Sequence, residues 1–201
     1  MVHVSITPEF ASFPNRRRWT RDECHRLVEL GFLAGRYELV EGEILSLMGQ
    51  NPPHRMTLIL IAGWLASVFG FYAVQTQGPV AIIGEEGATN EPEPDIVVTS
   101  KPTTAYLTRH PESQELLLTV EVSDTTLGFD LNTKARLYAR NGVAEYWVMD
   151  VNGRRLYRHR APSLDGYAEV VILAADEIVS PMACPDASAR VGDLLPPVEN
   201  Y

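Results

Sequence analysis

The sequence contains little cysteine, no long hydrophobic run and no apolar signal segment. Its two cysteines, Cys24 and Cys184, lie far apart in the 201 residues and show no metal-ligand spacing. This pattern argues against a disulfide framework, and we expect two reduced thiols in a cytoplasmic protein. The most apolar stretch, residues 56–69, is too short to cross a bilayer. We therefore expect a globular protein that does not span a membrane.

Positive charge is also scarce, because 17 Lys and Arg face 26 Asp and Glu, a formal net charge of −9. Taken alone, this balance argues against nucleic-acid binding, which needs cations for phosphate. The distribution is uneven, however. Residues 85–130 hold ten acids and two bases, whereas residues 131–160 hold seven bases and two acids. An acidic centre beside a basic segment fits a metal site next to a phosphate-binding surface. Charges scattered over solvated faces would give the same counts.

The order of predicted elements indicates one domain, residues 19–201, preceded by a flexible segment, residues 1–18. We expect an α/β (α+β) fold, in which a mixed central β-sheet is flanked by helices and preceded by an N-terminal helix and hairpin. Hydrophobic periodicity and capping residues predict the helices. Hydrophobic patterns and turn residues predict the strands, and Asn152-Gly153 predicts a hairpin turn between two of them. The predicted helices are residues 20–33, 54–69 and 131–141, and Asp130 is predicted to cap the last of them. The predicted strands are residues 37–40, 43–48, 72–76, 80–83, 95–99, 116–122, 145–151, 155–158 and 168–173.

Three short segments carry residues suited to phosphodiester chemistry. In EPEPDIVVT, the proline before Asp95 places this acid where the chain enters a strand. In LLLTVEVSD, Glu121 is the only charge in a buried strand, and Ser123 faces the same side. In DLNTKARLYA, Lys134 falls in the first turn of the following helix. A charge within an apolar strand is costly unless it is paired or binds a metal.

Together these residues predict metal-assisted hydrolysis. Two carboxylates on neighbouring strands offer the oxygen ligands that Mg²⁺, or Mn²⁺ in its place, prefers. The metal neutralises phosphate and lowers the pKa of a bound water, and a nearby lysine orients that water or stabilises developing charge. Each residue also has a plainer interpretation. Asp95 fits a turn, Glu121 fits a structural ion pair, and Lys134 fits an exposed helical position.

The same segments resemble the PD-(D/E)XK nuclease superfamily and, more closely, its restriction-endonuclease-like family Uma-two. The matching pieces include YELVEGEIL, EPEPDIVV, LTVEVSD and FDLNTKARLYARNGVAEYWVMD, and they extend from about residue 19 to 180. The resemblance implies that Asp95 and Glu121 bind the metal, with the backbone carbonyl of Val122 as a further ligand. The superfamily lysine would fall at position 123, where this chain has Ser123, so the resemblance makes Lys134 its counterpart.

Other residues in the resembling segments have supporting interpretations. Glu38 aligns with an acidic position that supports the metal directly or through water. His54 is either structural or, at the cleft, a phosphate contact or a group that supports a metal ligand. Asp130 is interpreted as a helix cap. Four arginines of the predicted hairpin have two interpretations: they contact a nucleic-acid backbone, or they face solvent. These are Arg154, Arg155, Arg158 and Arg160.

These observations lead to a Mg²⁺-dependent endonuclease acting on nucleic acid, with DNA expected, as the principal hypothesis. A homodimer is expected because symmetric dimers are the commonest assemblies. The alternative is a nuclease-like fold with little or no catalysis, serving as a nucleic-acid-binding or assembly module. Hydrolysis of another phosphate ester is disfavoured, because the sequence has neither a glycine-rich phosphate loop nor a histidine-rich metal cluster.

Overall fold

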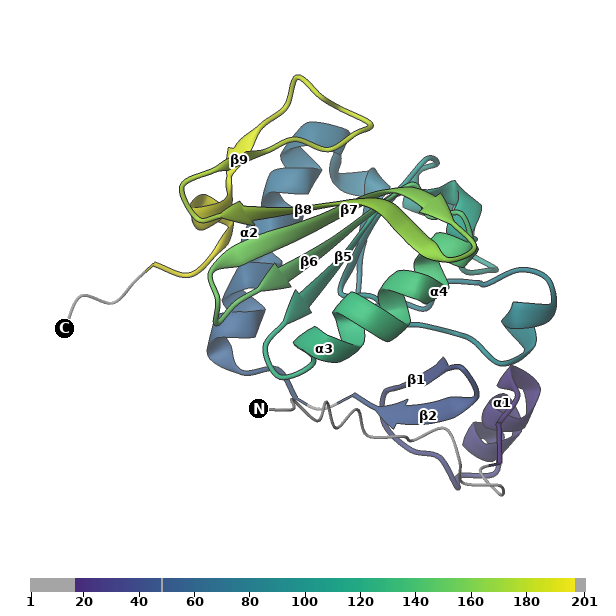
Figure 1. Cartoon of the computed structure of the whole chain (residues 1–201). Coiled ribbons are helices and arrows are strands. Elements are labelled where there is room, and N and C mark those ends of the chain that lie inside the picture. The colour runs from purple at the N-terminus through teal and green to yellow at the C-terminus, as the bar shows by residue number, and fades with distance from the viewer. Residues whose placement is uncertain (1–16, 48, 198–201) are drawn as a thin grey trace, which may run out of the picture.

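The computed structural model describes residues 17–47 and 49–197. The predicted flexible segment, residues 1–18, therefore lies almost wholly outside the described residues. The centre of the protein is a six-stranded mixed sheet with helices on both faces (Figure 1). This arrangement confirms the predicted fold class.

The central sheet has the strand order β3-β4-β5-β6-β7-β8. Its strands are β3 (Val74–Thr76), β4 (Ile96–Thr99), β5 (Leu116–Ser123), β6 (Glu145–Asp150), β7 (Arg155–Ser163) and β8 (Gly166–Ala174). Only β5 and β6 are parallel, and the helical segment between them makes the crossover that parallel neighbours require. Both strands are covered on their two faces, which explains why apolar residues occupy most of their positions.

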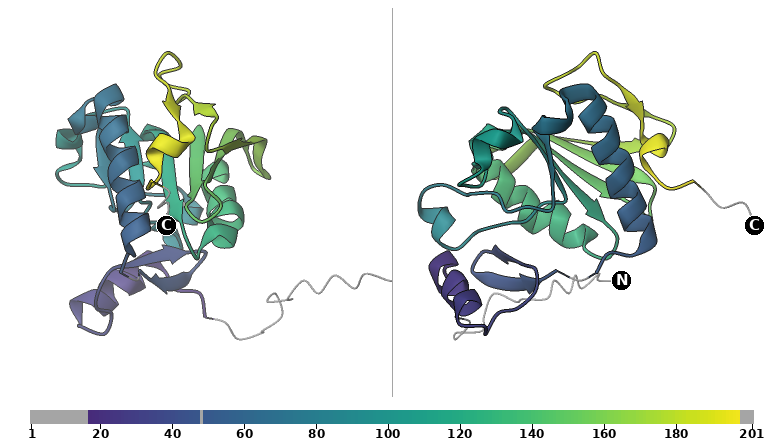
Figure 2. Two further views of the ribbon diagram at one scale, coloured as in Figure 1. Left: turned by 90° about the vertical axis from the view of Figure 1, so that its left-hand side faces the viewer. Right: turned by 180° about the vertical axis from the view of Figure 1, so that it is seen from behind.

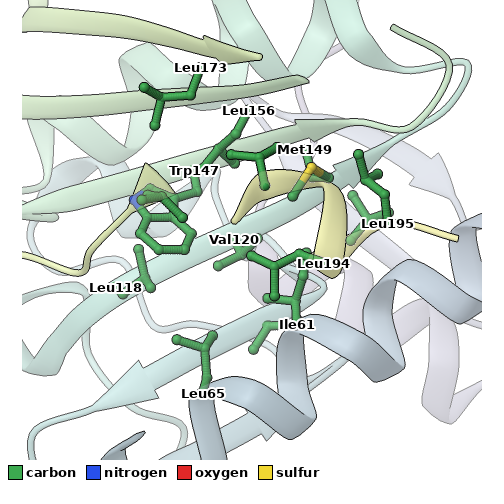
Figure 3. Packing of buried hydrophobic residues seen from close by; sticks show 14 of the residues in the cluster. Ile61, Leu65, Leu118, Val120, Trp147, Met149, Leu156, Leu173, Leu194 and Leu195 are labelled. Carbon is green, nitrogen blue, oxygen red and sulfur yellow. The ribbon is translucent and has the colours of Figure 1, made fainter. Parts of the chain in front are cut away.

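Helices cover the two faces of the sheet, as the left view of Figure 2 shows. The long helix α2 (Pro52–Phe69) packs on one face. The segment formed by α3 (Leu127–Phe129), a π-helical turn (Asp130–Lys134) and α4 (Ala135–Arg140) packs on the other. The core on the α2 side is closed by side chains from α2, the sheet and the C-terminal segment (Figure 3), including Ile61, Leu65, Val120, Trp147 and Leu194.

A smaller unit, α1 (Arg21–Glu29) and the hairpin β1 (Tyr37–Val40) and β2 (Glu43–Ser46), lies below the sheet in Figure 1. Thr20 forms a capping box with Glu23 at the start of α1. The helix ends four residues earlier than predicted, because Gly31 adopts a left-handed conformation with φ of +75° just after it. The hairpin is confirmed, and Glu41 and Gly42 both adopt the positive φ that its tight turn requires.

Several predicted boundaries are wrong. Residues 80–83 form no strand; only Ala81 makes an isolated bridge, to Glu112, although Val80 and Ile82 are buried. The apolar run marks burial there rather than a sheet position. Strand β3 starts at Val74, since residues 71–73 form a 3-10 turn.

The helix that carries Lys134 also differs from the prediction. It begins at Leu127, so Asp130 lies inside it and is not its N-terminal cap. Lys134 is correspondingly about two turns into the helical segment rather than in its first turn. The helix ends as expected before Gly142, which has a φ of +75°.

The C-terminal part is mostly loop, as predicted, with two short paired strands, β9 (Ile178–Val179) and β10 (Ala189–Arg190), and a 3-10 turn (Val191–Leu194). Glu145 anchors this part: its carboxylate accepts hydrogen bonds from Arg160, Trp147 and the Met182 backbone N–H. In the portion of the chain described here, none of the helices combines the length and apolar character needed to cross a membrane.

Candidate active site

A cleft of about 620 Å³ opens where the end of β5 meets the β1–β2 hairpin and the start of α2. Almost every residue singled out from the sequence lines it. These are Glu38, His54, Asp95, Glu121, Val122, Asp130 and Lys134. They come from segments that are separate in the chain, and the sheet and its two helical layers bring them together.

Asp95 and Glu121 are side by side because β4 and β5 are antiparallel neighbours. Ile96 pairs with Val120, so the residues just before and just after this pair adjoin. The Oδ2 atom of Asp95 accepts a hydrogen bond from the Val122 N–H at 2.9 Å. Its Oδ1 atom lies 3.3 Å from Nε2 of His54, which α2 brings to the cleft. These contacts hold the Asp95 carboxylate in a defined orientation.

Lys134 joins two glutamates that come from β1 and β5. Its Nζ atom donates to Oε1 of Glu121 at 3.0 Å and lies 2.9 Å from Oε2 of Glu38. Glu38 reaches this position because β1 pairs with the chain at Glu91, just before the EPEPD segment. At most 4% of Glu38, Glu121 or Lys134 is exposed, so this is a buried ion cluster rather than a surface salt bridge.

The π-helical turn explains how one helix directs three polar side chains to one side. Asp130, Lys134 and Tyr138 are four residues apart, and in a regular α-helix each such step overshoots a full turn by about 40°. A π turn, with i→i+5 bonds, contains more residues, so four residues fall short of a full turn. The π turn from Asp130 to Lys134 therefore offsets the α-helical drift from Lys134 to Tyr138. All three side chains are buried against the sheet.

The cluster contains more negative than positive charge. Burial raises the pKa of Glu121 well above its ordinary value; Lys134 offsets this only in part, and Asp130, Asp95 and Glu38 add to it. Burial lowers the pKa of the Lys134 ammonium, but the attraction of Glu121, Glu38 and Asp130 outweighs that effect and keeps it charged. The pKa values of Glu121 and Lys134 are both raised by the surrounding negative charge, which favours an additional cation in this site.

Ser123 and Asp130 contact each other and not the ion cluster. The Ser123 hydroxyl donates to Oδ2 of Asp130 at 2.7 Å, and the Thr126 hydroxyl donates to the same atom at 2.6 Å. Asp130 thus fixes the helix to the end of β5, a role different from the predicted helix cap. Lys134 extends past Ser123 to Glu121, two residues earlier on β5.

Tyr138 also contacts the site, as a group that supports Glu121. Its hydroxyl donates to Oε1 of Glu121 at 3.1 Å from a fully buried position. The four-residue spacing from Lys134 was the available signal, since such residues share a helix face. A second hollow adjoins the cleft at its mouth and shares Arg36, Gln50 and Gln77 with it. This hollow also contains Arg55, and no motif marks any of these four polar residues.

The arginines of the β6–β7 hairpin do not line the cleft. Each binds an acceptor of this chain. The pairs are Arg154 with the Pro196 carbonyl, Arg155 with Asp150, Arg158 with Glu169 and Arg160 with Glu145. The basic character of residues 131–160 is therefore largely neutralised within the protein.

The carboxylates of the cleft suit Mg²⁺ better than a metal whose ligands must all come from protein side chains. Within the described ranges, no three Asp, Glu, His or Cys side chains are grouped closely enough to hold an ion by themselves. Mg²⁺ keeps several waters and commonly takes only one or two carboxylates. Asp95 and Glu121 supply two adjacent carboxylates at a cleft, and the surplus of negative charge favours a cation there.

A mixed sheet between helices, with acidic residues at adjacent strands, defines a nuclease-like α/β fold. The chain belongs to the Uma2 family, described as "putative restriction endonuclease", whose model matches residues 24–192. A similar solved structure is that of a "putative nuclease" from Anabaena variabilis, with 15% identity and a TM-score of 0.62, covering 84% of this chain and 96% of the other. No curated protein matches the chain significantly.

Proposed function

We propose that this protein is a Mg²⁺-dependent endonuclease that hydrolyses phosphodiester bonds in DNA, with Asp95, Glu121 and Lys134 as its catalytic residues. The observation that carries the proposal is the buried cluster in which Lys134 lies between Glu38 and Glu121, beside Asp95, at the wall of a 620 Å³ cleft. Family membership supports nuclease activity in general. The metal, the substrate and the roles of the residues are inferred from the site.

Asp95 and Glu121 would bind the metal, together with the backbone carbonyl of Val122, and Glu38 would support it directly or through water. When bound, Mg²⁺ (or Mn²⁺) neutralises phosphate charge and lowers the pKa of a coordinated water. His54 keeps the Asp95 carboxylate oriented through the 3.3 Å contact. This arrangement leaves the rest of the metal shell to water and substrate, as hydrolysis requires.

Lys134 would act on the substrate as a fixed positive charge. Its ammonium group is held at 3.0 Å from Glu121 and 2.9 Å from Glu38, so it needs no rearrangement to stabilise charge that develops on phosphate. If Glu121 also binds the metal, one N–H donor of Lys134 would be available for the attacking water or a phosphate oxygen. The ammonium carries three donors, which permits this sharing.

The mouth of the cleft provides polar contacts for a nucleic-acid backbone. Arg55 is exposed there, and its side chain makes no hydrogen bond or ion pair with the described part of the chain. Arg36 is beside it and is paired with Glu93, while Gln50 and Gln77 add amide groups. Arginine and amide side chains are common contacts to phosphate oxygens. Their position offsets the objection from the net charge of −9.

The direct test is nicking of supercoiled plasmid DNA by purified protein, with and without Mg²⁺ or Mn²⁺. We expect metal-dependent cleavage that falls at least about 100-fold in Asp95→Asn and Glu121→Gln, because each change removes a carboxylate ligand. Glu169→Gln, on exposed β8, is the control and should cleave normally. Protein that cleaves neither DNA nor RNA with either metal would overturn the enzyme proposal.

The alternative function is a non-catalytic nucleic-acid-binding or assembly module. The close pairing of Lys134 with both glutamates favours it, because the same ion cluster could serve stability alone. Calorimetric titration with Mn²⁺ separates the two functions. Binding that disappears in Asp95→Asn supports the nuclease, whereas no binding to the native protein supports the module.

A further inference from the structure

Strand β8 is a long, unprotected edge of the central sheet. It contains nine residues, pairs with β7, and lies at the outer end of the strand order, as Figure 1 shows. Native proteins usually protect such an edge with a proline, a lysine or a very short strand, because its free backbone groups otherwise pair with another chain. β8 contains no proline and no lysine. Its one charge, Glu169, is bound to Arg158 on β7 at 3.0 Å.

The outward backbone groups in the regularly paired part of this edge belong to Val170 and Ile172. In an antiparallel pair, alternate residues direct both N–H and C=O away from the neighbouring strand. The Ala174 N–H donates to the Glu177 carboxylate at 2.7 Å, which places position 174 among the outward residues. Positions 172 and 170 follow by the alternation. Position 168 would be next, but the pairing of β7 with β8 is interrupted there, opposite Ala161 with its φ of +56°. No hydrogen bond within residues 17–47 and 49–197 engages the outward groups of Val170 and Ile172.

The side chains of the same two residues are apolar and exposed. Val170 is 50% exposed and Ile172 is 55% exposed. They form one wall of a groove of about 360 Å³ between β8 and the helical segment that packs on the sheet. Most of the remaining lining is also apolar or aromatic and includes Leu131, Ala135, Tyr157 and Tyr167. Unpaired backbone and exposed apolar side chains therefore coincide on one edge.

We propose that two copies of this chain associate through β8, antiparallel and about a twofold axis at Val171. This register places Val170 opposite Ile172 of the partner subunit and, by symmetry, Ile172 opposite the partner's Val170. Both pairs are of the kind that exchanges two backbone hydrogen bonds, so four bonds form. Glu169 then faces Leu173 of the partner subunit, and no like charges are opposed. The two exposed β-branched residues of each copy cover each other.

A second copy fits this edge better than an unrelated strand because the sequence of β8 is complementary to itself. Two apolar outward residues flank the axis, and the only acid of the strand is neutralised within its own chain. The Ala174–Glu177 hydrogen bond closes one end of the edge, which limits the pairing to its centre. The joined sheets would contain twelve strands and bury both grooves.

The proposal does not depend on the nuclease chemistry. β8 is separated from β5, which carries Glu121, by two intervening strands. Substitutions at positions 170–172 therefore leave the cleft residues untouched. Loss of the dimer with normal metal binding, and loss of cleavage with an intact dimer, are distinguishable results.

The experiment is to measure the molar mass of the full chain in solution by sedimentation or light scattering. We expect the mass of two chains for the native protein and at least a tenfold weaker dimer for Ile172→Lys, which sets a charge against the apolar edge. Ile178→Lys is the matched control, since Ile178 is equally exposed, at 55%, but lies on β9. Circular dichroism verifies that each variant is folded.

A second variant tests the register without a destabilising charge. Val171→Cys places two thiols opposite each other at the axis, where Cβ atoms are about 4.5–5.5 Å apart, so mild oxidation should yield a linked dimer. Ile178→Cys should not. A native protein that has the mass of one chain at every concentration overturns the proposal, as does a dimer that persists in Ile172→Lys. A monomer that instead captures a strand-forming peptide at β8 assigns the edge to a different occupant.

Discussion

The ammonium nitrogen of Lys134 lies 3.0 Å from Oε1 of Glu121, although the two residues are 13 positions apart and belong to a helix and a strand. The same nitrogen lies 2.9 Å from Glu38, on a separate hairpin. One buried cation thus joins three layers of the molecule. The stability of the fold and the charge balance of the cleft depend on the same side chain.

We predict that Lys134→Met destabilises the protein by about 3–5 kcal/mol, because Glu38 and Glu121 lose their buried counter-charge. Urea unfolding in the presence of a chelator measures this loss. Mn²⁺ should restore part of it, and restore more than it adds to the native protein, since the cation replaces the missing charge. Lys101→Met removes an exposed ion pair and should have a much smaller effect. Equal losses in the two variants would refute the buried-charge account.

A second prediction concerns Glu145, which is fully buried on the α2 side of the sheet. Its oxygens accept from Arg160, Trp147 and the Met182 N–H. Glu145→Gln turns one acceptor into a donor that faces other donors and leaves Arg160 without its counter-charge, so we expect a loss of about 3–5 kcal/mol in chemical unfolding. Mn²⁺ affinity should be unchanged, because the residue is on the face opposite to Glu121. A change in Mn²⁺ affinity would contradict that separation.

The pH dependence of stability should reveal the Glu115 cluster. Hydrogen bonds from Arg109 and Lys101 lower the pKa of Glu115 well below its ordinary value of 4.5. A lowered folded-state pKa stabilises the protein above pH 4.5, and this contribution is lost as the pH falls through the folded value. Glu115→Gln should therefore be less stable than the native protein at pH 7, with a difference that shrinks below about pH 4.5. A constant difference across this range would exclude the ion cluster as its cause.

Nucleic-acid binding should depend on Arg55 at the mouth of the cleft. Arg55→Ala should weaken DNA binding and reduce the slope of log affinity against log salt by about one, the value expected for one lost phosphate contact. Fluorescence anisotropy with Asp95→Asn as the background measures binding without cleavage. Arg26→Ala is the control, because Arg26 is on α1 and is paired with Glu29. An unchanged salt slope in Arg55→Ala would remove this residue from the substrate path.

The local pattern of the sequence was sufficient for many elements. The Thr20 capping box, the β1–β2 hairpin, the buried strands β5 and β6 and the end of the helix before Gly142 all follow from neighbouring residues. The prediction of a strand at residues 80–83 is wrong because an apolar run buried in a loop and one buried in a strand have the same sequence pattern. The start of the helix at Leu127 was missed because Asp130 is a good capping residue that here serves another purpose.

By itself, the sequence determined which residues needed partners. A carboxylate in an apolar strand, such as Glu121, and an acid after a proline, such as Asp95, are costly unless something compensates them. Only the tertiary structure decided what those partners are. The antiparallel register of β4 and β5 sets Asp95 beside Glu121, the π turn directs Lys134 inward, and the pairing of β1 with Glu91 adds Glu38. These contacts join distant segments, and pairings of that kind depend on sheet register and helix rotation, which no local pattern encodes.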